Sequence, residues 1–440
     1  MHLHSMAAPR PIEIWIDALP TPPLKRAVSE RRPLYEIGSN MDRTPIRGSK
    51  AINRGQEADD LELSTPRALT IPHPADVSMC ASPSLSSESS MNSRTGFSDA
   101  ASSRSQGLKR RRSESPKKRL ANLTLARYPV IQRSIGALRD LPSGAQTLAK
   151  NMRRCQLRVG ILHPESRDTM RPFLDIDSDD EMTDRLFSDG RGLVGDAPRI
   201  ADMMSIVRQA NENEAEQASE AAWNGDVHTA LLRVSLRCSK WRDELRCDNV
   251  TTASIEAGAF SLPQYRQGLE ELGSRIDFSI GIRLADDIKR RLSRCISSLN
   301  PTLYEPTRWS PTAIHIETKL TGEGWRAAQS QLSLWVTQHV AKLRELLALA
   351  DQPEGIPLPV LPVLVGQGHD WTVLFFEDHV DGARLYSGFS IGSSKNEVDA
   401  EAVCAGFHFL MDWAQTEYRL WFEKMILHPL LESISSRECH

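Results

Sequence analysis

One short apolar stretch, residues 313–319, constrains the fold of this 440-residue chain more than any other. It reads AIHIETK, and its β-branched Ile314 and Ile316 suit a pleated, packed strand. Side chains alternate across a strand, so Glu317 and Lys319 are expected on one face. A carboxylate and an ammonium side by side at the end of a buried strand are suited to hold a hydrated divalent metal ion and a phosphate oxygen between them.

The pattern Glu-x-Lys has little weight by itself, because it occurs by chance about once or twice in a chain of this length. An isolated match is most simply an exposed strand end. Here two further sequence features accompany the pattern. Residues 275–280 predict a second alternating strand with Asp277 in its middle, and residues 325–350 predict a helix with Gln331 one turn ahead of Trp335. The chain therefore presents, in order, a strand with an acid, a strand with Glu-x-Lys and a helix with a glutamine.

This order resembles the PD-(D/E)XK nuclease superfamily, with a closer resemblance, over residues 125–428, to the fungal PD-(D/E)XK nuclease-like domain family. The motifs that carry it are EAAWNGDVH at 220–228, RID at 275–277, SPTAIHIETK at 310–319, QLSLW at 331–335 and PVLVGQGHDW at 362–371. The resemblance implies an α/β (α+β) fold with a restriction-endonuclease-like core, in which helices flank a central mixed β-sheet. Composition, in turn, predicts a disordered N-terminal tail before this core.

The resemblance also implies hydrolysis of phosphodiester bonds in DNA, with Mg2+ or Mn2+ as the cofactor. Asp277 and Glu317 would be metal ligands, together with the backbone carbonyl of Thr318. Lys319 would orient the attacking water or stabilise the charge that develops on the phosphate. Gln331 would reach the same cleft from its helix.

A further carboxylate, that of Glu220, would join this site from the first matched helix. Two other functions stay open on the sequence. The nuclease fold could be retained as a catalytically silent binding or scaffold module in the nucleus, or the protein could be a structural interaction protein that acts through its tail. The presence of Asp277, Glu317 and Lys319 favours an active hydrolase, whereas an acidic body and the lack of a recognisable DNA-reading domain weaken that hypothesis. The oligomeric state stays open.

Composition divides the chain into segments. Residues 1–120 hold 19 Lys or Arg against 13 Asp or Glu, and residues 78–115 contain 14 serines with almost no large apolar side chains. Such a segment cannot offset the entropy of ordering, so it is expected to be a disordered tail. We expect a helical extension at 121–215, the nuclease-like core at 216–430 and a flexible end at 431–440.

Two basic clusters in the tail resemble a bipartite nuclear localisation signal. They imply a nuclear protein that binds an import receptor, and the alternative is a solvated run of charge. The clusters, separated by residues 113–116, consist of Lys109, Arg110, Arg111, Arg112, Lys117, Lys118 and Arg119.

A third basic feature lies on a predicted helix at residues 284–297. Its outer face would either follow a nucleic-acid backbone or be an ordinary solvated surface. The four cations of this face are Lys289, Arg290, Arg291 and Arg294.

Cysteine usage and hydropathy place the expected protein inside the cell. The seven cysteines show no C-x-x-C spacing, which fits reduced thiols. No apolar run approaches the ~20 residues that cross a bilayer, and no basic segment followed by an apolar run opens the chain. We therefore expect a soluble protein with no membrane partner.

The remaining strands and helices of the core follow from pattern and turn chemistry. Residues 249–260 and 359–365 are expected to be strands, and a hairpin is expected about Asp381-Gly382. A final helix is expected to begin at Ser394, with Glu397 completing a capping box. His228, on an apolar helix, is expected to be a buried residue with its hydrogen bonds satisfied.

Overall fold

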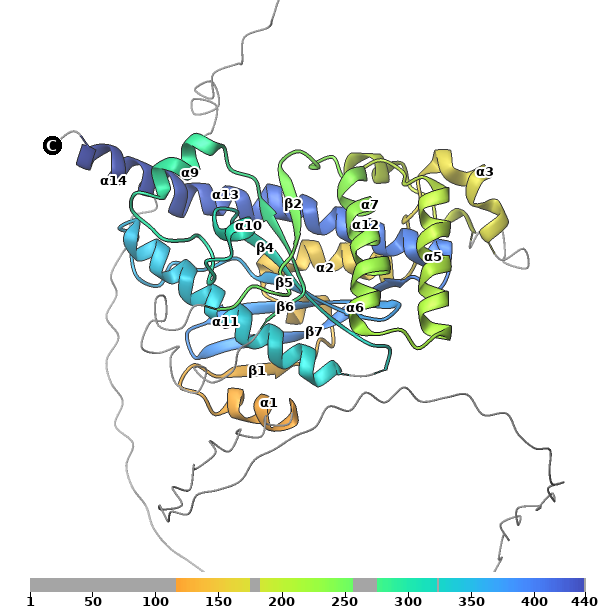
Figure 1. Cartoon of the computed structure of the whole chain (residues 1–440), viewed down its shortest axis with the longest axis horizontal. Coiled ribbons are helices and arrows are strands. Elements are labelled where there is room, and N and C mark those ends of the chain that lie inside the picture. The colour runs from red at the N-terminus through yellow and green to blue at the C-terminus, as the bar shows by residue number, and fades with distance from the viewer. Residues whose placement is uncertain (1–115, 175–182, 256–274, 323, 439–440) are drawn as a thin grey trace, which may run out of the picture. The chain divides into compact units, whose positions relative to one another are not determined.

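The structure, a computed structural model, describes residues 116–174, 183–255, 275–322 and 324–438 (Figure 1). The serine-rich tail and the first basic cluster, residues 109–112, lie outside this range, as does the segment 256–274. The second cluster, residues 117–119, lies in helix α1 (Pro116–Thr124). The nuclear-localisation signal therefore stays a prediction.

A mixed seven-stranded sheet runs through the folded part, in the order β1-β7-β6-β5-β4-β3-β2. The strand β4 lies inside this sheet, antiparallel to β3 and parallel to β5, and seven of its eight residues are buried. The strands are β1 (Val130–Arg133), β2 (Leu245–Asn249), β3 (Phe278–Ile282), β4 (Thr312–Lys319), β5 (Leu361–Gln367), β6 (Asp370–His379) and β7 (Gly382–Ser393).

Helices flank the sheet on both sides (Figure 1). Besides α1, the α-helices are α2 (Ser143–Gln156), α3 (Arg167–Met170), α5 (Ile200–Ala215), α6 (Glu220–Ala222), α7 (Thr229–Cys238), α9 (Asp286–Leu292), α10 (Glu305–Arg308), α11 (Trp325–Leu349), α12 (Glu397–Trp413), α13 (Arg419–Phe422) and α14 (His428–Glu438). Three π-helical segments join some of them end to end: η6 (Trp223–His228), η7 (Ala414–Tyr418) and η8 (Glu423–Leu427). Short 3-10 segments are η2 (Leu138–Asp140), η3 (Pro164–Ser166), η4 (Arg171–Phe173) and η5 (Asp189–Leu193).

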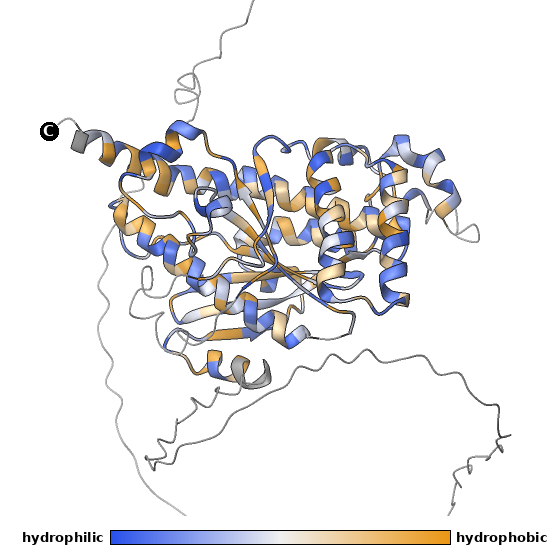
Figure 2. Ribbon diagram, viewed as in Figure 1, coloured by the Kyte–Doolittle hydropathy of each residue, from blue (hydrophilic) through white to orange (hydrophobic). Residues whose placement is uncertain are grey.

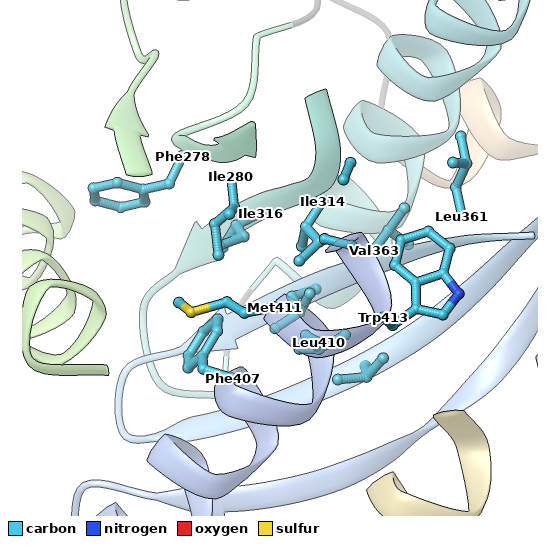
Figure 3. Packing of buried hydrophobic residues seen from close by; sticks show 14 of the residues in the cluster. Phe278, Ile280, Ile314, Ile316, Leu361, Val363, Phe407, Leu410, Met411 and Trp413 are labelled. Carbon is cyan, nitrogen blue, oxygen red and sulfur yellow. The ribbon is translucent and has the colours of Figure 1, made fainter. Parts of the chain in front are cut away.

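The even-numbered residues of β4 form part of the core beneath α12. Ile314 and Ile316 are fully buried, and Figure 3 shows them on the side of the sheet that faces Phe407 and Met411 of α12. Alternation along the strand then turns the odd-numbered residues to the opposite face.

The odd-numbered face of β4 is covered by α11. His315 Nε2 lies 2.7 Å from His339 Nδ1 of α11, and both rings are fully buried. Burial lowers the pKa of His339 to about 3, so the contact is a hydrogen bond between neutral rings. Glu317, two residues beyond His315, extends from this same face at the end of the strand.

Helix surfaces in Figure 2 alternate between hydrophilic and hydrophobic residues, as expected for helices that bury one side against a sheet. Among the described residues, no helix combines the length and apolar character needed to span a bilayer.

Several predicted boundaries were wrong. The strand expected at 275–280, with Asp277 in its middle, is β3, which begins one residue after Asp277. The strand expected at 249–260 is instead β2, and it ends at Asn249 because the Asn249 side chain accepts hydrogen bonds from the backbone and hydroxyl of Thr251, which turns the chain. The helix expected at 284–297 is the shorter α9. The last long helix begins after Asn396, whose side chain caps the Asp399 N–H at 2.8 Å. The hairpin about Asp381-Gly382 is confirmed, with His379 paired to Gly382.

Candidate active site

Asp277 lies at the entrance of β3 and is tied to β4 on either side of Glu317. Its backbone N–H donates to the Ile316 carbonyl at 3.0 Å. Its Oδ2 accepts the backbone N–H of Thr318 at 2.8 Å and lies 2.7 Å from the Thr318 hydroxyl. Asp277 is 9% exposed, so its carboxylate is held in place by β4 and largely shielded from water.

Thr318 connects this carboxylate to the helical segment that precedes β2. Its hydroxyl also lies 2.7 Å from Asn224 Oδ1, and with one proton it donates to one of the two oxygens at a time. Asn224 sits in the π-helical segment η6, a type of distortion often found at functional sites. Asn224 thus helps to hold the Thr318 side chain in place, and Thr318 in turn holds the Asp277 carboxylate.

His228, also on η6, fixes the far end of this chain of contacts. Its Nδ1 is 2.9 Å from Asn224 Oδ1 and its Nε2 is 2.8 Å from the Gly368 carbonyl oxygen. Burial lowers its pKa to about 4, so the ring is neutral and its single N–H donates to one of these two oxygens at a time. The expectation that His228 is a buried helix residue is confirmed, and its N–H has a hydrogen-bond acceptor.

Glu317 and Lys319 meet at the end of β4. Lys319 Nζ donates to Glu317 Oε1 at 2.5 Å and to the Thr318 carbonyl oxygen at 2.7 Å, and it lies 3.5 Å from Glu220 Oε2. Glu317 is 1% exposed, and its second oxygen, Oε2, has no hydrogen-bond partner among the described residues. The carboxylate is therefore only half satisfied by the protein.

The electrostatics of the site follow from this burial. The pKa of Glu317 is raised to about 8, chiefly by burial and also by the nearby Asp277, against the opposing effect of Lys319. Burial lowers the pKa of Lys319, but the surrounding carboxylates outweigh it and raise it above its usual value. Burial also raises the pKa of Glu220, which Lys319 opposes. Excess negative charge in a dry site is the condition that a divalent cation relieves.

The oxygens that would hold a metal fit Mg2+ in number and kind. Mg2+ is bound through one or two carboxylates with waters and substrate phosphate, and the Glu317 and Asp277 carboxylates with the Thr318 carbonyl offer such a set. Within the described residues, no group of three or more His, Cys, Asp or Glu is placed to hold a metal ion. Glu220 as a third carboxylate ligand therefore stays a proposal, and the Lys319 ammonium now contacts two of the candidate oxygens.

Gln331, on α11, contacts the segment that leads into Asp277. Its Nε2 donates to the Arg275 carbonyl oxygen at 3.3 Å. The side chain thus joins α11 to the segment that leads into Asp277. A direct catalytic role for Gln331 remains a prediction.

The basic face predicted around residue 290 is partly used inside the fold. Arg291 Nη2 donates to the Leu431 carbonyl at 3.0 Å and to Ser435 Oγ at 2.8 Å, so it holds α14. Lys289 pairs with Asp286 at 2.9 Å. Arg290 and Arg294 are exposed, which leaves their predicted contact with nucleic acid untested.

Sequence reasoning missed two residues that shape the site. Asn224 could have been found from its spacing, because it stands four residues before His228 on one helix face. Gly324 carried no such signal. It has φ +71°, and a Cβ there would come within 2.7 Å of Lys319 Cδ, so the glycine leaves room for the lysine stem.

A mixed sheet that brings two acids and a lysine together at the ends of neighbouring strands, with helices on both faces, defines a restriction-endonuclease-like fold. The family model described as PD-(D/E)XK nuclease superfamily matches residues 167–419, more than half of the chain. The chain belongs to the PD-(D/E)XK nuclease superfamily. No curated protein and no solved structure matches it, and the closer resemblance to the fungal branch stays a prediction.

Proposed function

We propose that this protein is a Mg2+- or Mn2+-dependent nuclease that hydrolyses phosphodiester bonds in DNA. The observation that carries the proposal is the buried Glu317 carboxylate, beside Asp277, with one oxygen left without a partner among the described residues. Leaving such an atom unsatisfied costs about 1–3 kcal/mol. A metal ion would satisfy it.

Glu317, Asp277 and the Thr318 carbonyl would hold the metal ion. When bound, that ion would polarise the phosphate and lower the pKa of a water. The Thr318 N–H and hydroxyl keep the Asp277 carboxylate oriented. Lys319 gives up its contacts with Glu317 and the Thr318 carbonyl, and its ammonium then donates to a phosphate oxygen or to the attacking water.

A cleavage assay tests the proposal. Supercoiled and linear DNA, with RNA as a separate arm, are incubated with the full chain in Mg2+, in Mn2+ and in EDTA. We expect cleavage that needs the metal and falls at least about 100-fold in Asp277→Asn and Glu317→Gln. Cleavage that survives in both variants would point to a contaminant and contradict the proposal.

The catalytically silent binding module remains the second candidate. The Lys319 ammonium already donates to the Glu317 carboxylate and to the Thr318 carbonyl oxygen. In a silent module, this ammonium would take the place of the metal ion. A protein that binds DNA with equal affinity in EDTA and Mg2+, and cleaves nothing, would support this function instead.

A further inference from the structure

A polar cavity lies at the opposite end of β3 from Asp277. It has a volume of about 340 Å³ and lies between the start of β2, the end of β3, α9 and α10. Its polar lining consists of Arg246, Arg283, Lys289, Glu305, Trp309 and Ser310. Six residues at about 3.3 Å each separate Asp277 from Arg283 along the strand direction, roughly 20 Å, so the cavity is distinct from the Glu317 site.

Three of the four charged residues that line the cavity are neutralised by neighbours. The pairs are Arg246 with Asp248 at 2.5 Å, Lys289 with Asp286 at 2.9 Å and Glu305 with Arg308 at 3.3 Å. Arg283 is the exception, since it forms no ion pair with any described residue. The lining thus carries one uncompensated positive charge.

The fold holds the Arg283 guanidinium in a defined position. The Arg283 backbone N–H donates to the Glu244 carbonyl, and Nε donates to the Leu245 carbonyl, both at 2.7 Å. Its two terminal nitrogens have no hydrogen-bond partner among the described residues. This leaves the pair of parallel N–H groups with which arginine binds a phosphate in bidentate fashion.

A planar surface stands in the same cavity. Trp309 is half-buried, and the Arg308 guanidinium lies 5.0 Å from the centroid of its ring. This cation–π contact restrains the indole. Indole rings provide a stacking surface for any nucleobase.

We propose that this cavity binds a nucleotide unit, with the phosphate on Arg283 and the base against Trp309. The volume lies at the lower end of the range of about 300–1,000 Å³ found for small-molecule sites. The unit is either a free mononucleotide or one nucleotide of a single-stranded nucleic acid. Both sources present the same phosphate and planar base.

Calorimetric titration of the full chain in EDTA tests the proposal, because without metal the outcome is independent of cleavage. The probes are inorganic phosphate, 5′-AMP and a short oligodeoxyadenylate. Arg283→Glu should weaken binding of the nucleotide probes about 10–100-fold. Arg208→Glu, at an exposed cation on α5 outside the lining, is the matched control and should bind like the wild type.

Two further variants sharpen the result. Trp309→Leu should weaken binding of the nucleotide probes but leave phosphate binding unaffected. Arg283→Gln replaces Arg283→Glu if circular dichroism shows that the charge reversal unfolds the chain. If 5′-AMP binds, a free nucleotide is sufficient for recognition by the cavity. If only the oligonucleotide binds, the cavity recognises one nucleotide of a nucleic-acid strand. Equal affinities for the Arg283 and Arg208 variants, or no binding of either nucleotide probe, would overturn the proposal.

Discussion

Glu317 is a buried carboxylate whose charge the protein only partly compensates. Its pKa is about 8 in the folded chain against an ordinary value of 4.5. A raised folded-state pKa stabilises the fold fully below the unfolded value, and this stabilisation is lost as the pH rises through the folded value. Because of Glu317, the metal-free protein should therefore become progressively less stable as the pH rises from about 4.5 to about 8.

Glu317→Gln should remove this loss. In EDTA at pH 8.5, we expect the variant to be roughly 1–3 kcal/mol more stable than the wild type, with little difference near pH 4.5. Denaturant unfolding at a series of pH values measures it, with Glu305→Gln on the surface of α10 as the control. Parallel pH curves for wild type and Glu317→Gln would refute this explanation.

Gly324 should matter through the position of Lys319. Gly322, in the same loop, has φ +72° with open space where a Cβ would be, whereas a Cβ at Gly324 meets the Lys319 stem. Alanine at either site should cost about 1 kcal/mol, because both have positive φ.

Only Gly324→Ala should also reduce metal-dependent cleavage, by about tenfold or more. The rate of DNA cleavage in Mg2+, compared between the two alanine variants, tests the difference. Equal rates would remove the positioning role assigned to Gly324.

At the scale of elements, the hydroxyl of Thr318 links β4 to the carboxylate at the start of β3 and to η6. Thr318→Val keeps the shape and removes contacts to Asp277 and Asn224, so it should cost about 1–3 kcal/mol. Thr337→Val on α11 is the matched control. Thr337 is equally buried, and its hydroxyl has no partner among the described residues.

The control should be neutral or stabilising, because removing an unsatisfied buried hydroxyl relieves a desolvation cost. Urea unfolding of both variants measures the difference. If the two valine variants are equally stable, the Thr318 hydroxyl does not hold the elements together.

Much of this architecture could be predicted from sequence, because it depends on local periodicity. The alternation in AIHIETK placed Glu317 and Lys319 on one strand, and the apolar run near residue 363 predicted the buried β5. Contacts between residues that lie far apart in the sequence could not be predicted this way. Thr318 and Asn224 meet across 94 positions, and Arg246, Arg283 and Trp309 gather only when β2, β3 and α10 are in place.

At the scale of the whole molecule, the tail is proposed to direct the protein to the nucleus. A reporter fused to residues 100–125 should concentrate in nuclei, and changing residues 109–112 and 117–119 to alanine should abolish this by removing seven positive charges. Fluorescence microscopy of the two fusions measures it. Identical distributions would exclude the signal.

The most direct measurement for the proposed metal centre is Mn2+ binding to the full chain by electron paramagnetic resonance, at pH 8 and with a phosphorothioate DNA duplex present. We predict that the wild type binds Mn2+, that Glu317→Gln and Asp277→Asn lose at least about tenfold in affinity, and that Lys319→Ala binds at least as tightly as the wild type. Retention of wild-type Mn2+ affinity in both carboxylate variants, or no Mn2+ binding by the wild type, would contradict the metal-dependent nuclease.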